Sequence, residues 1–418
     1  MGRRGLWNRN FAGLMVTQFA GAANDNLLKS VLLIAFASTG IWSKALGDAG
    51  TGVVTLFLTV PFVLLLGYAG QLADRLPKNR IIIATRIAEV PIAILASLGF
   101  ILDSPWLVVA AFVLLASESA FFSPAKYGCI PEVVDQDQVN AANGFINMMT
   151  NIAILLGTWL GGRLLQSGTH FVAIVLPGVA ILGLVSSLFI RGLKPIRPGL
   201  EWSWNPFGPY MHAIRYMRPG LVWDATLAWS WFYASAIVVL AIIPEYGRYL
   251  QLGEDESTYL SYLLGAVGLG VGIGCVSAGL LSGGRIRGWF CILGGFGTSF
   301  LFMLLGVLNP SDLSFWSLIG VLFMIGVFGG FYLIPIQSIQ QLCSTPGDRA
   351  RVLGMANAMS FLLMTVSSAI YSAVIHFLPV LPTRGSLGCG LLMLAVTLWM
   401  LRGRGRRVIE ARAPESGV

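Results

Sequence analysis

The feature that most constrains this chain is a series of apolar stretches, each about 20 residues long, between short polar breaks. A helix needs about 20 apolar residues to cross a bilayer, where its backbone groups must bond within the segment. Charged residues make up only 11% of the 418 residues, too few to cover a soluble globule. The pattern predicts an all-α membrane protein and excludes disordered, coiled-coil and secreted disulfide-rich chains.

Twelve membrane-spanning helices are expected, and the longest polar break divides them into six and six. This predicts an N-terminal six-helix half at 1–190, a cytoplasmic linker at 191–218, a C-terminal six-helix half at 219–402 and a basic cytoplasmic tail at 403–418. The expected spans are 11–39, 50–73, 80–102, 106–125, 139–165, 170–190, 219–246, 257–281, 288–308, 314–342, 351–377 and 385–402.

The basic residues predict the orientation of these spans. Most of the 27 Lys and Arg residues fall at breaks on the side of the N-terminus, whereas only Lys44, Arg163, Arg248 and Arg384 fall on the other side. Cytoplasmic loops carry such an excess, so both termini are expected in the cytoplasm. The same bias accounts for the net charge of +8 without nucleic-acid binding.

Two breaks resemble each other and indicate an internal duplication. Gly70 and Lys78, between spans two and three, recur as Gly279 and Arg287, both 209 residues later. Two six-span halves joined by a basic linker are typical of transporters whose halves move around a site near the membrane midplane. In the linker, the apolar residues from Phe207 to Met217 recur at three- and four-residue steps, which predicts an amphipathic helix in the headgroup layer. That helix is either a passive surface element or a docking surface for a partner.

Polar residues inside spans are the candidate site, because each is costly in a bilayer unless it faces protein or water. Span one carries Asn24, Asp25, Asn26 and Lys29. Asp25 and Lys29 are four residues apart on one helix face and can pair. The group is interpreted as a site for a lipid headgroup or an ion, the alternative being a static ion pair.

Spans three, four and five add further candidates. Arg86 and Glu89 are expected to form a structural pair, although Arg86 is close enough to the cytoplasmic edge to reach it. Glu118 is interpreted as a buried, protonatable group or a structural one, and Lys126 lies two turns beyond it. Span five has a stripe of amides on one face, which either joins helices or lines a cavity; it consists of Asn140, Asn143, Asn147 and Asn151.

Other site chemistries are not indicated by the residues. The five Cys and three His are scattered without metal-ligand or redox spacing. No nucleophile–base arrangement and no phosphate-binding GxxxxGK[ST] loop occurs. We therefore expect no enzyme activity, metal or cofactor, and any energy must come from gradients.

The break between spans two and three resembles the signature loop of the major facilitator superfamily. The matching residues are Gly70, Asp74, Arg75, Lys78 and Arg80, with Gly283 in place of the acid in the second copy. In that family the Asp is thought to bond the start of span eleven and to steady one state of the transport cycle. The resemblance implies a gating role for these residues, and a carboxylate near a helix N-terminus is favoured physically.

Two further stretches are similar to bacterial lysophospholipid transporters. These are Gln18–Lys29, which contains Asn24-Asp25-Asn26, and the run from Ser123 to Gly128 followed by Ala142-Asn143-Gly144. The resemblance implies a secondary transporter of the bacterial inner membrane that returns lysophospholipids to the inner leaflet for re-acylation, by an acyltransferase that would be a separate chain. Lys29 or Lys126 would hold the phosphate and the span-five amides would line the polar path. The rivals are a proton-coupled exporter of amphiphilic drugs and a non-transporting membrane partner of an acyltransferase.

Overall fold

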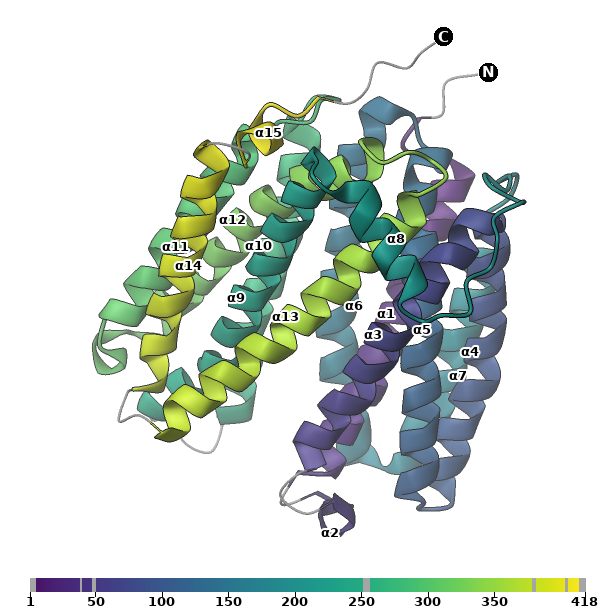
Figure 1. Ribbon diagram of the computed structural model, residues 1–418. Helices are drawn as coiled ribbons and strands as arrows, with labels where there is room; N and C mark the ends of the chain where they lie inside the picture. The colour runs from purple at the N-terminus through teal and green to yellow at the C-terminus, as the bar shows by residue number, and fades with distance from the viewer. Residues whose placement is uncertain are drawn as a thin grey trace. The chain divides into compact units, whose positions relative to one another are not determined.

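The computed structural model describes residues 5–37, 40–46, 50–250, 256–377, 381–402 and 405–412, and this part of the chain is helical with no strand. Twelve helices are long (Figure 1): α1 (Arg9–Ala35), α3 (Gly50–Arg75), α4 (Lys78–Ile101), α5 (Pro105–Val133), α6 (Val139–Ser167), α7 (Thr169–Ser187), α9 (Leu221–Tyr249), α10 (Glu256–Leu281), α11 (Trp289–Val307), α12 (Phe315–Leu342), α13 (Arg349–Phe377) and α14 (Gly385–Leu401). The short helices are α2 (Ser43–Leu46), α8 (Gly208–Met217) and α15 (Arg406–Ile409), and single 3-10 turns lie at Gln136–Gln138, Pro310–Asp312 and Pro382–Arg384.

The membrane-protein prediction is confirmed by the length and composition of these helices. Within the described residues, eleven helices are long and apolar enough to cross a membrane. The twelfth long helix, α1, is less apolar because it carries Asn24, Asp25, Asn26 and Lys29 in its middle. Part of the predicted tail, at 403–404 and 413–418, and the end of the first predicted span, at 38–39, lie outside the described residues.

The fourth predicted span ends too early. Helix α5 runs on to Val133 and contains both Pro124 and Pro131. Proline removes one backbone donor, but neighbouring helices can satisfy the freed carbonyl in a membrane bundle. Lys126 lies just beyond the predicted span of 106–125, but it is a buried residue inside a helix, with 6% of its surface exposed.

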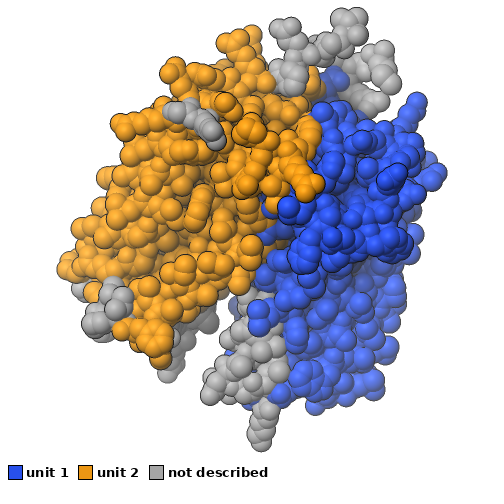
Figure 2. Space-filling view, in the orientation of Figure 1, with its two compact units in different colours: residues 1–135, 149–213, 345–358 blue, residues 136–148, 214–344, 359–418 orange. Residues whose placement is uncertain are grey.

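The chain divides into two compact units that do not coincide with the sequence halves (Figure 2). Unit 1 comprises residues 1–135, 149–213 and 345–358, and unit 2 comprises 136–148, 214–344 and 359–418. The first residues of α6 thus belong to unit 2, and the first residues of α13 belong to unit 1. Each unit therefore consists mainly of one sequence half and takes one helix start from the other.

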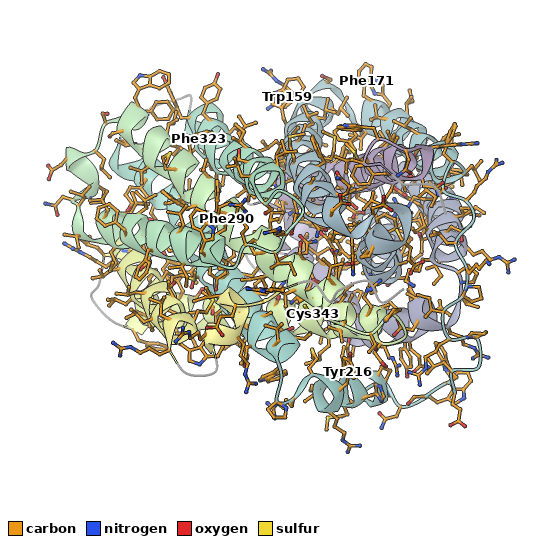
Figure 3. All side chains as sticks on the ribbon, turned by 90° about the horizontal axis from the view of Figure 1, so that it is seen from above. Trp159, Phe171, Tyr216, Phe290, Phe323 and Cys343 are labelled. Carbon is orange, nitrogen blue, oxygen red and sulfur yellow. The ribbon has the colours of Figure 1, made fainter. Side chains whose placement is uncertain are left out.

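Unit 1 is built around α4, which packs against α5 and α7, while α1 packs against α7 and α5. Its apolar core includes Phe36, Trp42 and Phe100, and the ring of Trp42 stacks on that of Phe100 at 5.6 Å. The indole N–H of Trp42 donates to the Asp103 carboxylate at 2.8 Å. Large apolar side chains at the rim, such as Trp159 and Phe171, are exposed, as expected for lipid-facing positions (Figure 3).

Unit 2 contains α9 to α12 and α14, with α10 packed against α12 and α11 against α14. Gly274 of α10 lies against the backbone of α12 at Val327, and Gly330 of α12 lies against the backbone of α10. Small residues allow such close approach. Close packing matters in a bilayer because the hydrophobic effect does not drive helices together there. Phe290 is buried beside α12, in the interior of the view from above (Figure 3).

Candidate functional site

A cluster of buried charges joins α1, α4 and α5 inside unit 1. The guanidinium of Arg86 bonds to Glu89 on its own helix and to Glu118 of α5, the latter at 2.6 Å. The amide of Asn24 on α1 donates to Glu89 at 2.8 Å. Arg86 also lies over the ring of Phe122, 4.4 Å from its centroid. The predicted Arg86–Glu89 pair is confirmed, but Arg86 is 1% exposed and does not reach the surface.

The geometry of Glu118 follows from this cluster. Its carboxylate accepts from Arg86 and is within 3.5 Å of the Ser119 hydroxyl. The guanidinium neutralises the charge of the Glu118 carboxylate. This arrangement favours a structural role for Glu118 over direct binding of a lipid headgroup. Glu118, which we predicted as a substrate ligand, is thus a buried residue whose direct partner is Arg86.

Asp25 and Lys29 on α1 do not form the ion pair that their spacing predicts. Asp25 turns to α5, where the Ser119 hydroxyl donates to it at 2.7 Å. Within the described part of the chain no ion pair joins it to Lys29, because the carboxylate is engaged across the helix interface rather than along its own helix. Asn26 donates to the Ala22 carbonyl of its own helix at 2.8 Å.

Lys126 is a buried cation that lies against aromatic rings. Its ammonium is 4.1 Å from the ring centroid of Tyr127 and 5.5 Å from that of Phe122. Among the described residues, neither Lys126 nor Lys29 forms a salt bridge. Lys126 is buried and Lys29 is partly buried. A lysine in such a place without a salt bridge is costly, so both positions favour the arrival of an anion.

The predicted gating residues lie at the contact between α3 and the start of α13. The Asp74 carboxylate is fully buried and accepts from the backbone N–H of Ala350 at 2.9 Å and of Arg351 at 3.2 Å. The Arg351 guanidinium donates to the same group at 3.1 Å. This is the helix N-terminal bond that the resemblance implied, and it satisfies backbone donors that the helix itself leaves free.

Of the remaining residues of the gating motif, Gly70 and Lys78 make close contacts, whereas Arg75 and Arg80 form no ion pair within the described residues. A Cβ at Gly70 would lie 2.8 Å from the Ala350 carbonyl oxygen, so only glycine lets the two helices approach this closely. Lys78 is buried and pairs with Glu132 of α5 at 2.6 Å. Arg80 is exposed.

Asn143 and Asn147, in the middle of the asparagine stripe, join α6 to α12 within unit 2. Asn143 and Gln341 of α12 exchange amide hydrogen bonds at 2.7 and 3.1 Å. One turn on, Asn147 donates to Gln337 at 2.7 Å. Here Asn143, Asn147, Gln337 and Gln341 are called the amide ladder. Of the two interpretations left open by the sequence, the observed contacts favour helix-to-helix bonding for Asn143 and Asn147.

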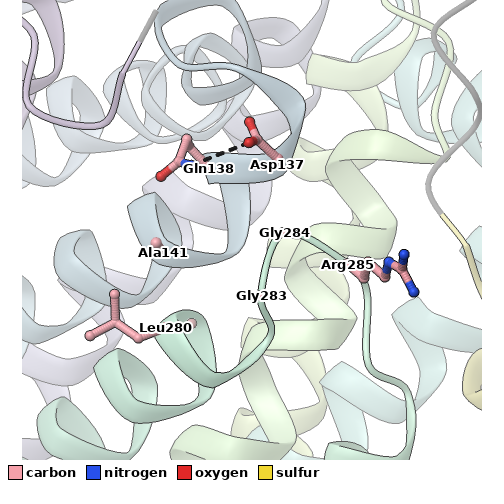
Figure 4. A pocket seen from close by; sticks show the side chains of 8 residues that line it. Asp137, Gln138, Ala141, Leu280, Gly283, Gly284 and Arg285 are labelled. Carbon is pink, nitrogen blue, oxygen red and sulfur yellow. Dashed lines mark hydrogen bonds between the residues drawn. The ribbon is translucent and has the colours of Figure 1, made fainter.

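The second copy of the loop lies beside the start of α6. The Asn140 side chain donates to the Arg285 carbonyl at 2.9 Å, and a Cβ at Gly279 would lie 2.6 Å from the Asn140 carbonyl oxygen. A hollow of about 400 Å³ lies here, lined by Asp137, Gln138, Ala141, Gly279, Leu280, Gly283, Gly284 and Arg285. Figure 4 shows that the Gly283–Gly284 turn faces the Asp137–Gln138 segment across it.

Two parts of this arrangement were missed from the sequence. Ser119 is the partner of Asp25, and a serine beside an acid in an apolar span is a weak signal. Asp348 lies just before α13 and accepts from Thr345 at 2.9 Å and from His212 at 3.1 Å. Its position at a helix start, three residues after Thr345, is a capping pattern that would have identified it.

Known proteins resemble this chain over most of its length. A lysophospholipid transporter, LplT, of Enterobacter sp. (strain 638) is 27% identical, with 96% of this chain and 97% of that protein covered. The protein of the same name from Photorhabdus laumondii is 24% identical, with coverages of 94% and 96%.

Solved structures share the fold at low identity. The human organic anion transporter MFSD10 has a TM-score of 0.75 at 12% identity, covering 93% of this chain and 98% of that one. The fucose:proton symporter FucP of E. coli has a TM-score of 0.71 at 13% identity, covering 95% and 98%. Residues 14–368 match the Major Facilitator Superfamily. With the α3–α13 contact and the helical fold, this match shows that the chain is a multi-pass membrane transporter, not an enzyme, and that it belongs to the Major Facilitator Superfamily.

Proposed function

We propose that this transporter moves lysophospholipids from the outer to the inner leaflet of a bacterial inner membrane, with both termini in the cytoplasm. The observation that carries the proposal is the pair of cations, Lys29 and Lys126, that lack a salt bridge beside a cluster whose other charges are bonded. A lysolipid brings a phosphate, the anion these positions lack. Relatives named as lysophospholipid transporters support the same substrate class.

The residues have distinct roles in this proposal. Lys126 holds the phosphate, and the rings of Phe122 and Tyr127 stabilise its ammonium by cation–π contact before the lipid binds. Lys29 adds a second positive charge from α1, and Asn24 and Asp25 supply polar groups for the rest of the headgroup. The acyl chain remains among apolar helices or in lipid. The lipid then passes to the inner leaflet by alternating access, and a separate acyltransferase re-acylates it.

One observation bears on the rival, a proton-coupled exporter of amphiphilic drugs. Asp25 accepts from a hydroxyl rather than from a guanidinium, so among the acids of this cluster it is the better proton carrier. The two functions predict opposite fluxes. Inward lysolipid movement that does not respond to a proton gradient supports the proposal, and outward drug movement driven by the gradient supports the rival.

The test of the proposal is substitution of Lys126 in proteoliposomes with a fluorescent lysophosphatidylethanolamine. Lys126→Met should abolish inward movement, whereas Lys126→Arg should retain part of it, because a phosphate needs the charge more than the stem. Lys194→Met is the control, since Lys194 is an exposed linker lysine. Equal activity of the Met and Arg variants, each with a wild-type melting temperature, would contradict the assignment.

A further inference from the structure

The part of the linker from Arg197 to Tyr210 belongs to unit 1 and is bonded there to α3. The backbone N–H of Arg197 donates to the Asp74 carbonyl at 3.1 Å. The Tyr68 hydroxyl of α3 donates to the Trp204 carbonyl at 2.7 Å, and the Tyr210 hydroxyl of α8 donates back to Val63 of α3 at 2.6 Å. A segment held at three places on one helix is not a free tether.

Two linker residues converge on a single carboxylate. Arg197 donates to Asp348 at 3.3 Å, and the His212 ring lies 3.1 Å from the same oxygen. These residues are 15 positions apart, one before and one within α8. The Thr345 hydroxyl and the Arg351 guanidinium also donate to Asp348. Asp348 is therefore the point at which the linker, the α12–α13 loop and the start of α13 meet.

Arg351 connects this point to the gating contact. Its Nε donates to Asp74 while its Nη2 donates to Asp348. Asp74 is fully buried, whereas Arg197 and His212 expose about half of their side chains, 50% and 49%. The Asp74–Arg351 contact is thus shielded from water. The bonds of Arg197 and His212 to Asp348 are exposed to solvent, which weakens them and lets them open reversibly.

We propose that the linker controls the opening of the contact between α3 and the start of α13. Arg197 and His212, here called the linker clasp, hold Asp348 and thereby position the start of α13 against α3. Asp348 is a positioning residue in this scheme, because it acts on α13 and through Arg351 on Asp74. Opening of the α3–α13 contact requires the clasp to release Asp348, so the linker regulates the transport cycle as well as joining the halves.

The test uses hydrogen–deuterium exchange of the full-length protein in nanodiscs, which reports the clasp without any substrate. Asp348→Asn keeps the shape and removes the charge. We expect several-fold faster exchange at the Arg197 amide, which bonds to Asp74, and at the Ala350 and Arg351 amides. Lysolipid movement in proteoliposomes should change by about threefold or more, since a small shift in a two-state balance changes the cycle rate.

Two further variants keep the proposal falsifiable. Glu201→Gln makes the same chemical change at an exposed linker position and should leave exchange unchanged. Arg197→Gln with His212→Gln leaves Asp348 intact and should reproduce the Asp348→Asn result. Unchanged exchange at residues 350 and 351 in both the Asp348 variant and the double variant would overturn the proposal. If exchange is faster in the variants but the wild-type protein moves no lysolipid, the proposed substrate is wrong and the proposed role of the clasp is supported.

Discussion

The α3–α13 contact in unit 1 and the α10–α6 contact in unit 2 come from repeated sequences, yet different chemistry holds them. Both have a glycine that lets two backbones meet: Gly70 against Ala350, and Gly279 against Asn140. In unit 1 a buried carboxylate, Asp74, then bonds the helix start.

In unit 2 the acid is replaced by Gly283, whose φ of 58° lies in the left-handed region. The Asn140 side chain and the amide ladder hold α6 instead. The two contacts share the close approach of the helices, whereas the polar groups that close each contact differ. An ionic contact responds to charge and pH, and an amide contact does not.

The largest loss of transport is expected from substituting the glycine that both contacts share. Gly70→Val and Gly279→Val should each abolish lysolipid movement, because the added Cβ would lie 2.8 and 2.6 Å from backbone oxygens, and overpacking costs about 1–3 kcal/mol or more. Gly178→Val on α7 is the matched control, since nothing lies within 4 Å of a Cβ there. Wild-type movement in either variant would show that its contact is not required.

A smaller effect, confined to unit 1, is expected from Asp74→Asn. The amide can still accept from one backbone N–H, but the charge at the helix start and the pair with Arg351 are lost, a cost of about 1–2 kcal/mol. Transport should fall roughly tenfold with normal expression. Gly283→Asp should give no gain in unit 2, because the Asn140 side chain and the amide ladder already hold α6 there. Unchanged cysteine accessibility at residues flanking α13 in Asp74→Asn would contradict the gating role.

The fold could be predicted from the sequence because span length and apolar content are properties of local segments. The gating bond was also predictable, since Asp74 belongs to a recognisable motif. The failure of Asp25 and Lys29 to pair could not be predicted. Their i,i+4 spacing makes a pair possible, but Ser119 on α5 competes for the same carboxylate. The end of α5 was missed because Pro124 signals a stop in isolation but not within a bundle. Asp348 was missed because its linker partners, Arg197 and His212, lie more than 100 residues away, and the local pattern with Thr345 does not reveal them.

Two side chains of the amide ladder, Asn143 and Gln341, should show coupling in a double-mutant cycle. Asn143→Leu and Gln341→Leu each leave a buried amide without its partner, which costs about 1–3 kcal/mol. The double variant removes both polar groups and should recover most of the lost melting temperature. Asn309→Leu, at an exposed position with no side-chain capping bond, is a control for the loss of an amide as such. Additive losses in the double variant would show that the two side chains act independently.

The smallest effect concerns the pH response of Asp348, which lies outside the membrane-spanning helices. Burial alone would raise the pKa of this carboxyl, but hydrogen bonds from Thr345 and His212 and the charges of Arg351 and Arg197 outweigh it and hold the pKa below the ordinary 3.8. A carboxyl whose pKa falls on folding stabilises the folded state above its unfolded pKa, and that contribution is lost as pH falls through the folded value.

The clasp should therefore be insensitive to the titration of Asp348 between pH 8 and 5 and should weaken only below about pH 4. The measurement is protection of the Arg197 amide from hydrogen exchange, corrected for the intrinsic rate, in a His212→Gln background that removes the imidazole. The amides of α6 that bear the ladder serve as the internal reference, because no ladder side chain titrates. Protection at Arg197 that declines between pH 6 and 5 would contradict the lowered pKa. Loss of protection in the α6 reference over the same range would show that the protein itself is unfolding, and the pH series would then need a lower temperature to isolate the clasp.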